Sequence, residues 1–173
     1  MVVGDGPEAA RLRAKAGPNV TFVGYQPDEV LRDYLRRARA FVCAGREELG
    51  MGMVEAQACG TPVIAYGKGG ALEVVRGLDR QSPTGILYEQ RSAAAIVAAV
   101  DLFEREGGRI TADSCRDAVL HFAPETFRAR FAARVDEAMD DFRLPDEFGP
   151  NTAPLLLSPP RAETPLALAL SGR

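Results

Sequence analysis

Short apolar runs alternate with amphipathic stretches along most of the chain. The runs have the length and composition of buried strands and occur at residues 1–3, 20–23, 41–43, 63–65 and 85–88. Apolar residues at helical spacing predict helices at residues 8–16, 29–39, 51–58, 91–106, 111–122 and 124–142. This alternation of strand and helix predicts an α/β fold, with a parallel sheet followed by C-terminal helices.

The pattern stops at Arg143. Residues 143–173 hold six of the twelve prolines of the chain and show no helical or strand period. Such a composition is typical of a flexible, disordered tail. The sequence therefore predicts a folded part at residues 1–142 and a Pro-rich tail at residues 143–173.

The stretch at residues 45–65 reads as a glycine turn, a short helix, a glycine stop and a strand. A helix start after such a turn offers unpaired backbone N–H groups and the positive end of the helix dipole, which suit a phosphate or diphosphate. Glu47 and Glu55 lie on the two sides of this turn, with seven residues between them. Carboxylates bind hydroxyls, so the pair could hold the ribose and the hexose of a nucleotide sugar. The alternative is that both are solvated surface glutamates.

The residues around this pair resemble the donor-site signature of retaining GT-B glycosyltransferases of the group 1 type. The resemblance rests on the Glu-x7-Glu spacing and on the run from Val54 to Ala65. It implies that Glu47 contacts the donor hexose as the catalytic residue and that Glu55 contacts the ribose. It also implies that the backbone of Gly50 and Met51 faces the phosphate and the sugar. The run from Glu55 to Glu73 resembles bacterial mannosyltransferase-like members, which favours GDP-mannose as the donor.

Other glycine turns follow the predicted strands. Gly4 and Gly6 follow residues 1–3, where a dinucleotide fingerprint would need a third glycine that is missing. The resemblance instead identifies this segment with the second strand and turn of the donor domain, and it places Gly24 near the nucleobase. Gly69 and Gly70 form an anion nest after the strand at residues 63–65. Because this loop and the Glu47 loop follow successive parallel strands, we expect both at one edge of the sheet.

Charge and composition narrow the function further. The net charge of −3 disfavours a nucleic-acid partner, and no apolar run is long enough for a transmembrane helix. The odd number of cysteines indicates reduced thiols in a cytoplasmic protein, and the single histidine, His121, is expected to be structural. No Asp-x-Asp cluster is present, so we expect no metal and no cofactor besides the nucleotide sugar substrate.

The resemblance covers residues 2–142 and only part of a GT-B enzyme. It implies most of the C-terminal, donor-binding half, which is a Rossmann-like, doubly wound parallel sheet. It also implies a truncated fragment without the N-terminal acceptor domain and without the first donor-domain strand. We therefore expect the isolated chain to be inactive and to need the acceptor domain as a partner, and the parent enzyme could contact a membrane peripherally. The alternatives are a non-catalytic fragment that binds a nucleotide sugar, or a GT-B epimerase or phosphorylase. The epimerase is disfavoured by the single histidine, and the phosphorylase is disfavoured because no segment resembles the one that carries a cofactor-bearing lysine.

Overall fold

The structure is a computed structural model that describes residues 1–142; the predicted tail lies outside the described residues. Three parallel strands form its sheet: β1 (Phe41–Cys43), β2 (Val63–Tyr66) and β3 (Gly85–Tyr88). The strand order is β1-β2-β3, and Ile64 in the middle pairs with Val42 on one side and Ile86 on the other. The predicted parallel sheet is therefore confirmed over residues 41–88.

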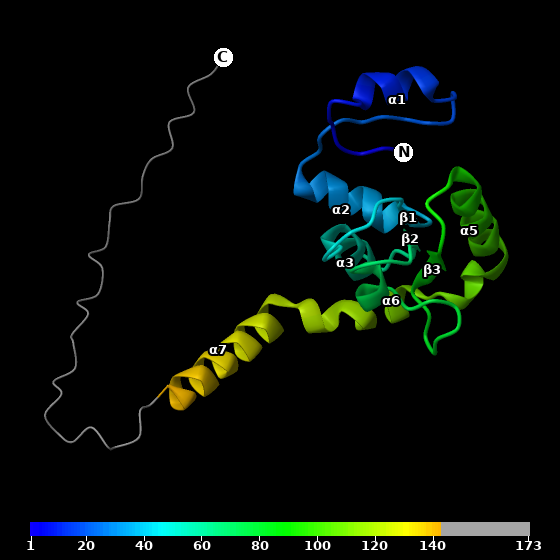
Figure 1. The fold of residues 1–173 in the computed structure, drawn as a ribbon. Helices are drawn as coiled ribbons and strands as arrows, with labels where there is room; N and C mark the ends of the chain where they lie inside the picture. The colour runs from blue at the N-terminus through cyan, green and yellow to red at the C-terminus, as the bar shows by residue number, and fades with distance from the viewer. Residues whose placement is uncertain (143–173) are drawn as a thin grey trace, which may run out of the picture. The chain divides into compact units, whose positions relative to one another are not determined.

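Helices connect and cover these strands (Figure 1). They are α1 (Ala9–Lys15), α2 (Asp28–Arg37), α3 (Met51–Ala58), α4 (Ala71–Val74), α5 (Ala93–Glu106), α6 (Ala112–Val119) and α7 (Pro124–Asp141). The helix predicted at residues 111–122 is shorter than expected: α6 ends at Val119 and a 3-10 turn, η2 (Leu120–Phe122), follows. Pro124 explains the end of this segment, because a residue before proline avoids the helical region, and Ala123 is extended with ψ 142°.

The two faces of the sheet carry different helices, as a doubly wound fold requires, and α6 at the end of the sheet contributes to both clusters. Val63 and Ala65 of β2 pack in one cluster with apolar residues of α2, α3, α4 and α6. Ile64 of the same strand packs in a second cluster with β3, α5 and Cys115 of α6. Figure 1 shows α3 and α5 on opposite sides of the strands. This alternation follows from the period of two along a strand, and it confirms the Rossmann-like fold with helices on both faces.

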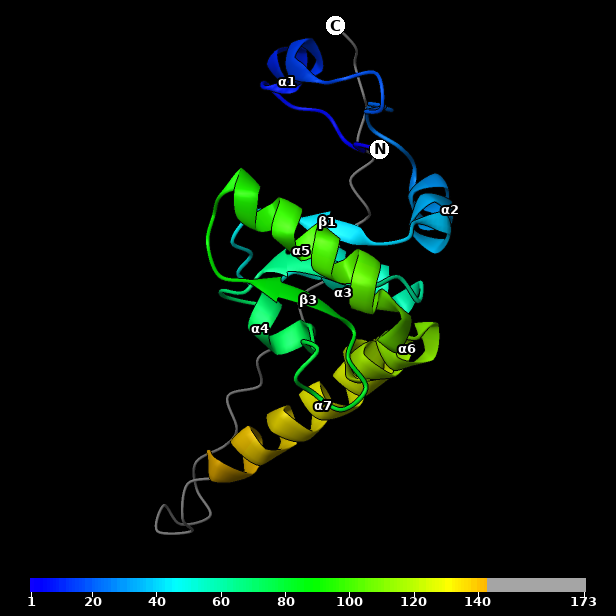
Figure 2. The same ribbon diagram turned by 90° about the vertical axis from the view of Figure 1, so that its right-hand side faces the viewer.

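The N-terminal segment differs from the expectation. Residues 1–3 and 20–23 form only an isolated parallel bridge between Val2 and Phe22, and not two strands of the main sheet. Figures 1 and 2 show this segment with α1 beyond α2, apart from the three strands. The physical reason is that no helix buries these residues: Val2 is exposed, and α1 has no buried residue. Two short strands without an apolar layer above them have little to hold them extended.

Two buried polar side chains fix α3 against its neighbours. The Thr61 hydroxyl donates a hydrogen bond of 2.6 Å to the carbonyl of Leu35 at the end of α2. The Gln57 amide, which is fully buried, donates to the carbonyl of Val74 at 2.9 Å and to that of Met53 at 3.2 Å. Because buried donors are costly to leave unpaired, these contacts set the position of α3 relative to α2 and α4.

The ionisation of Cys115, in α6, tests whether the second core cluster is closed to water. Its side chain is fully buried, and this burial raises the pKa of the thiol to about 11 despite the opposing effect of Arg116. In the unfolded chain the thiol ionises near its ordinary pKa of about 8.5. The buried neutral thiol therefore contributes stability that is fully present below that pH and is lost as the pH rises towards 11. We expect a loss of up to about 3 kcal/mol in unfolding free energy.

The measurement is urea unfolding of the native chain and of Cys115→Ala between pH 7 and pH 11. At pH 7 the variant should be less stable than the native chain, because the substitution leaves a cavity. Since the variant lacks the thiol, its stability does not include the loss caused by thiol ionisation. The plots of unfolding free energy against pH should therefore converge above pH 9. Tyrosine and lysine titrations affect both proteins equally. Parallel curves over the whole range would contradict the burial of this thiol.

Candidate functional site

The loops that follow β1 and β2 meet at the carboxyl edge of the sheet. The backbone N–H of Gly70 donates a hydrogen bond of 2.8 Å to the carbonyl of Glu47, and Glu47 pairs with Gly69 in an isolated parallel bridge. The expectation that both loops share one edge is confirmed. We call this contact between residues 45–50 and 67–70 the loop clasp.

The clasp depends on the absence of side chains at its two glycines. Gly69 has a φ of 65°, in the left-handed region, and a Cβ there would collide with the carbonyl of Glu47. Gly70 has a helical φ of −58°, but a Cβ there would lie 2.6 Å from the carbonyl oxygen of Glu48. Both glycines thus have a packing role that sequence reasoning missed, and their predicted contact with a nucleotide sugar stays a prediction.

The start of α3 lies directly after the clasp. Gly50 caps this helix in the left-handed region, with φ 77° and ψ 38°, which glycine adopts without strain. Its carbonyl accepts the N–H groups of Met53 and Val54, at 2.9 and 3.2 Å. The N–H groups of Met51 and Gly52 donate to no residue within the described range. They remain available to an anion at the positive end of the helix dipole.

The two glutamates lie on either side of this helix start. Glu47 belongs to the clasp, and its Cβ lies 3.9 Å from where a Cβ on Gly50 would be. Glu55 lies one turn into α3, on the exposed face that also carries Met51 and Ala58. Both carboxylates are exposed and neither forms an ion pair with any described residue. The structure therefore places Glu47, Gly50, Met51, Glu55, Gly69 and Gly70 in one neighbourhood.

Beyond Glu55 a hollow of about 410 Å³ opens between α2 and α3. Leu31, Leu35, Ala58 and Cys59 give it an apolar part, and the charged side chains that line it are Asp28, Arg32, Arg36 and Glu55. Sequence reasoning did not identify this hollow. The signal that could have found it is the spacing of Asp28, Arg32 and Arg36, four residues apart on one face of a predicted helix.

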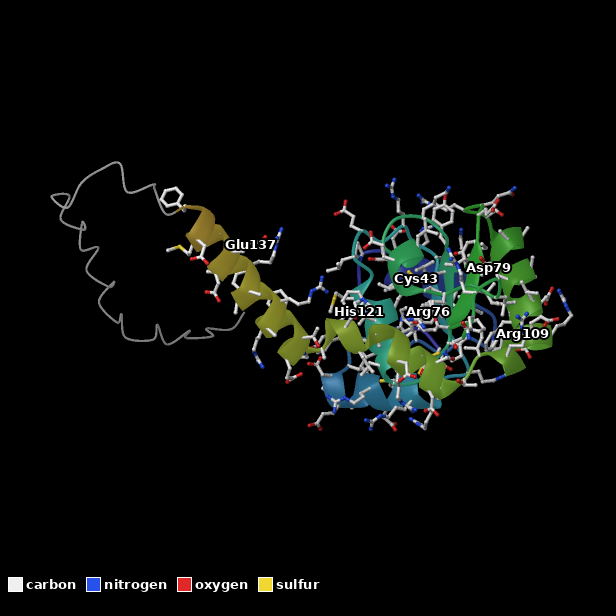
Figure 3. All side chains as sticks on the ribbon, turned by 90° about the horizontal axis from the view of Figure 1, so that it is seen from below. Cys43, Arg76, Asp79, Arg109, His121 and Glu137 are labelled. Carbon is white, nitrogen blue, oxygen red and sulfur yellow. The ribbon has the colours of Figure 1, made fainter. Side chains whose placement is uncertain are left out.

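Cys43 and Tyr88 form a partly buried polar contact between β1 and β3. The Tyr88 hydroxyl donates to the carbonyl of Cys43, the last residue of β1, at 3.3 Å, and Figure 3 labels Cys43. Burial is the main cause that raises the pKa of the Cys43 thiol, with the carboxylate of Glu47 adding to it and a hydrogen bond to Gly45 opposing it. Burial also raises the pKa of Tyr88. Both groups therefore stay protonated at neutral pH, as supports for the loop.

The remaining predicted glycines form a separate group. The N–H of Gly4 donates to the carbonyl of Gly24 at 2.8 Å, and both have positive φ values, 108° and 68°. The N–H of Gly6 donates to the side-chain oxygen of Asp5 at 3.2 Å. Within residues 1–142, no hydrogen bond joins these glycines to the loop clasp or to α3. Their predicted contact with a nucleotide sugar stays a prediction.

Other candidate chemistry lies elsewhere. His121 is exposed in η2, directly after α6, and its ring is tilted by 39° against that of Phe122, with ring centroids 4.0 Å apart. Figure 3 shows it away from Arg109 and Asp79. Over residues 1–142, no group of three or more His, Cys, Asp or Glu side chains could hold a metal ion. No helix in this range is both long and apolar enough to span a membrane.

Comparison with known proteins identifies the family. Residues 1–120 match the family described as Glycosyl transferases group 1. The chain belongs to this family. A curated relative of this group 1 chain is 2-deoxystreptamine N-acetyl-D-glucosaminyltransferase from Streptomyces fradiae, 29% identical over 150 residues. The match covers 83% of this chain and 33% of the relative, so the chain spans about a third of that protein's length.

Solved structures show the same fold for this group 1 glycosyltransferase chain. Sucrose-phosphate synthase from Thermosynechococcus elongatus superposes with a TM-score of 0.67 and 28% identity, over 80% of this chain and 38% of that one. Anabaena HepE in complex with UDP-glucose superposes with a TM-score of 0.57 and 22% identity, over 80% of this chain and 40% of HepE. These neighbours have the GT-B architecture, and the described sheet with its helices matches part of it.

The loop clasp gives a test of its own. Gly70→Ala should lower the unfolding free energy by about 1–3 kcal/mol, because the new Cβ meets the backbone of Glu48 and Leu49, which cannot rotate away. Gly108→Ala is the matched control: a Cβ there meets no heavy atom within 4 Å, and its effect should stay within about 0.5 kcal/mol. Urea unfolding measures both. Equal stabilities of the two variants would show that the loops are not in close contact.

Proposed function

We propose that this chain is the donor-binding part of a retaining glycosyltransferase that moves a hexose from a nucleotide diphosphate sugar to an acceptor. The observation that carries the proposal is the start of α3. There the N–H groups of Met51 and Gly52 have no acceptor among residues 1–142, and the glutamates on either side, Glu47 and Glu55, form no ion pair in this range. Membership of the group 1 family supports it.

Each part of the site has a role suited to its chemistry. The diphosphate lies at the start of α3, where the N–H groups and the helix dipole stabilise the charge that develops on the leaving nucleoside diphosphate. Glu55 accepts hydrogen bonds from the ribose hydroxyls. Glu47, in the clasp, binds the hexose. Its negative carboxylate stabilises the positive charge that develops at the anomeric carbon. We propose that donor binding needs no metal, because the helix start supplies positive potential.

The nucleotide sugar is proposed as a class. Relatives and neighbours are named for N-acetylglucosaminyl transfer and for complexes with UDP-glucose, whereas the run from Glu55 to Glu73 resembles mannosyltransferase-like proteins. We propose mannose as the first hexose to test, with glucose and N-acetylglucosamine as comparisons. The acceptor site is proposed to come from the N-terminal domain of a GT-B enzyme, either as part of a longer chain or as a partner. Donor binding without transfer in that assembly would favour the non-catalytic alternative.

Substitutions of the two glutamates should affect nucleotide binding and sugar transfer differently. Glu55→Ala should weaken binding of the nucleoside diphosphate by about 1–3 kcal/mol, since it removes charge-assisted hydrogen bonds to the ribose. Glu47→Ala should leave this affinity nearly unchanged and chiefly lower transfer in the enzyme assembled with its acceptor domain. Glu48→Ala, which removes the neighbouring exposed carboxylate of the same loop, is the matched control for both.

Calorimetry with GDP, UDP and ADP, in buffer with EDTA, measures the affinities, and release of nucleoside diphosphate measures transfer. Equal losses of affinity from Glu47→Ala and Glu55→Ala would contradict the separate roles. Unaltered affinity and transfer in both variants would contradict the proposed site as a whole. Binding that appears only after Mg²⁺ or Mn²⁺ is added would contradict the metal-free proposal.

A further inference from the structure

One face of α7 carries an apolar stripe that is exposed along the helix. α7 has 18 residues, and every residue from Phe127 to Asp140 is exposed. The stripe consists of large apolar side chains three or four residues apart, each at least 44% exposed: Phe127, Phe131, Val135, Met139 and, directly after the helix, Phe142. At this spacing the side chains share one side of the helix. A continuous stripe of this kind is typical of a helix that packs against another helix.

The charges of α7 are arranged against the helix dipole. Its basic residues precede Val135, and its acidic residues other than Glu125 follow it: Arg128, Arg130 and Arg134, then Asp136, Glu137, Asp140 and Asp141. The last turn holds no basic residue. Bases near the N-terminus and acids near the C-terminus of a helix destabilise it when it is isolated. The order of the charges therefore does not stabilise α7 by itself, and it suits a partner with the reverse order.

The same helix in the opposite direction is such a partner. We infer that α7 pairs with α7 of a second copy of this chain, antiparallel and around a two-fold axis near Val135. The pairing places the basic half of each helix beside the acidic half of the other, and it sets the two helix dipoles in opposite directions. A two-fold interface uses the same surface of both copies, so one self-complementary stripe is sufficient.

The side chains along the stripe fit this pairing. With Val135 at the axis, Phe131 of each copy lies opposite Met139 of the other, and each stripe covers the other. Arg130, Arg134 and Glu137 follow one border of the stripe at helical spacing, and Figure 3 labels Glu137 on α7. Arg134 pairs with Glu137 within the helix. In an antiparallel pair the same borders face each other, so the arginines of one copy also meet Glu137 of the other.

A parallel pair would lack this complementarity. It would place the two basic halves side by side and the two acidic halves side by side, and like charges at a helix contact repel. The antiparallel direction is therefore part of the inference. The pairing involves only α7, so it goes beyond the proposed function and does not depend on it.

Sedimentation equilibrium of the 173-residue chain over a range of concentrations tests the pairing. We expect a reversible equilibrium between monomer and dimer. Val135→Asp should raise the dissociation constant of the dimer at least about ten-fold, because it places a carboxylate of each copy in the apolar contact at the axis. Ala133→Asp is the matched control, because it adds the same charge on the opposite face of α7. Its effect should stay within about two-fold.

Cross-linking determines the direction of the pair. Phe131→Cys and Met139→Cys chains, mixed in equal amounts and oxidised, should form a covalent dimer that contains one chain of each kind. Phe131→Cys alone should cross-link no more than the native chain, which has the same three native cysteines. Circular dichroism of every variant checks that the fold is retained, as expected for substitutions at exposed positions.

Three results would overturn the inference. One is a chain that stays monomeric at every concentration, and another is an equal effect of Val135→Asp and Ala133→Asp on the dimer. The third is self-cross-linking of Phe131→Cys above the level of the native chain, which would show a parallel pair. None of these measurements involves a nucleotide, so their failure would leave the proposed function unchanged.

Discussion

The contact on which the site depends is a single backbone hydrogen bond, from the N–H of Gly70 to the carbonyl of Glu47. It joins two loops that leave adjacent parallel strands, and it exists because Gly69 and Gly70 have no side chains to keep the loops apart. Once these loops are joined, the left-handed turn at Gly50 starts α3 directly above the carboxyl edge of the sheet. The position of Glu47 and the direction of the free N–H groups both follow from this contact.

The second constraint is the burial of α3 on nearly every side. This helix has only eight residues, too few to be stable alone, and Met53, Val54, Ala56 and Gln57 are all buried. Gln57 ties it to the end of α4, and Thr61 ties the turn after it to the end of α2. What remains exposed is the narrow face with Glu55. A short helix held in this way can present one carboxylate and one anion site with little freedom to move.

Much of this arrangement follows from local patterns in the sequence. The β-branched run at Val63 and Ile64, the glycine stop at Gly60 and the spacing of Glu47 and Glu55 needed only short windows. The joining of the loops followed from parallel topology, since carboxyl ends of adjacent strands share an edge. Each of these features is set by residues close in sequence or by a general rule of chain connection.

The features that sequence reasoning missed depend on contacts between distant segments. Gln57 looks like any polar helix residue until α4 is placed against it, and the hollow exists only because α2 and α3 pack with a gap beside Glu55. The strand predicted at residues 20–23 was wrong for a different reason: the local pattern was present, but the neighbouring strands were not. Phe22 has the local character of a strand residue, but a strand needs neighbours, and only Val2 pairs with it.

Carboxylates on both sides of a diphosphate repel it. The size of this repulsion, compared with the positive charge nearby, decides whether the site can hold a diphosphate. At about 4 Å, two unit charges repel by roughly 1 kcal/mol in water and by roughly 4 kcal/mol at an effective dielectric constant of 20. Glu47 and Glu55 are exposed, so the smaller figure applies to them. The helix start contributes about half a positive charge, and the joined loops also carry Arg46 and Lys68, neither of which is ion-paired within residues 1–142. These positive contributions are of the size needed to offset the repulsion, so exposed glutamates can select hydroxyl groups without expelling the diphosphate between them.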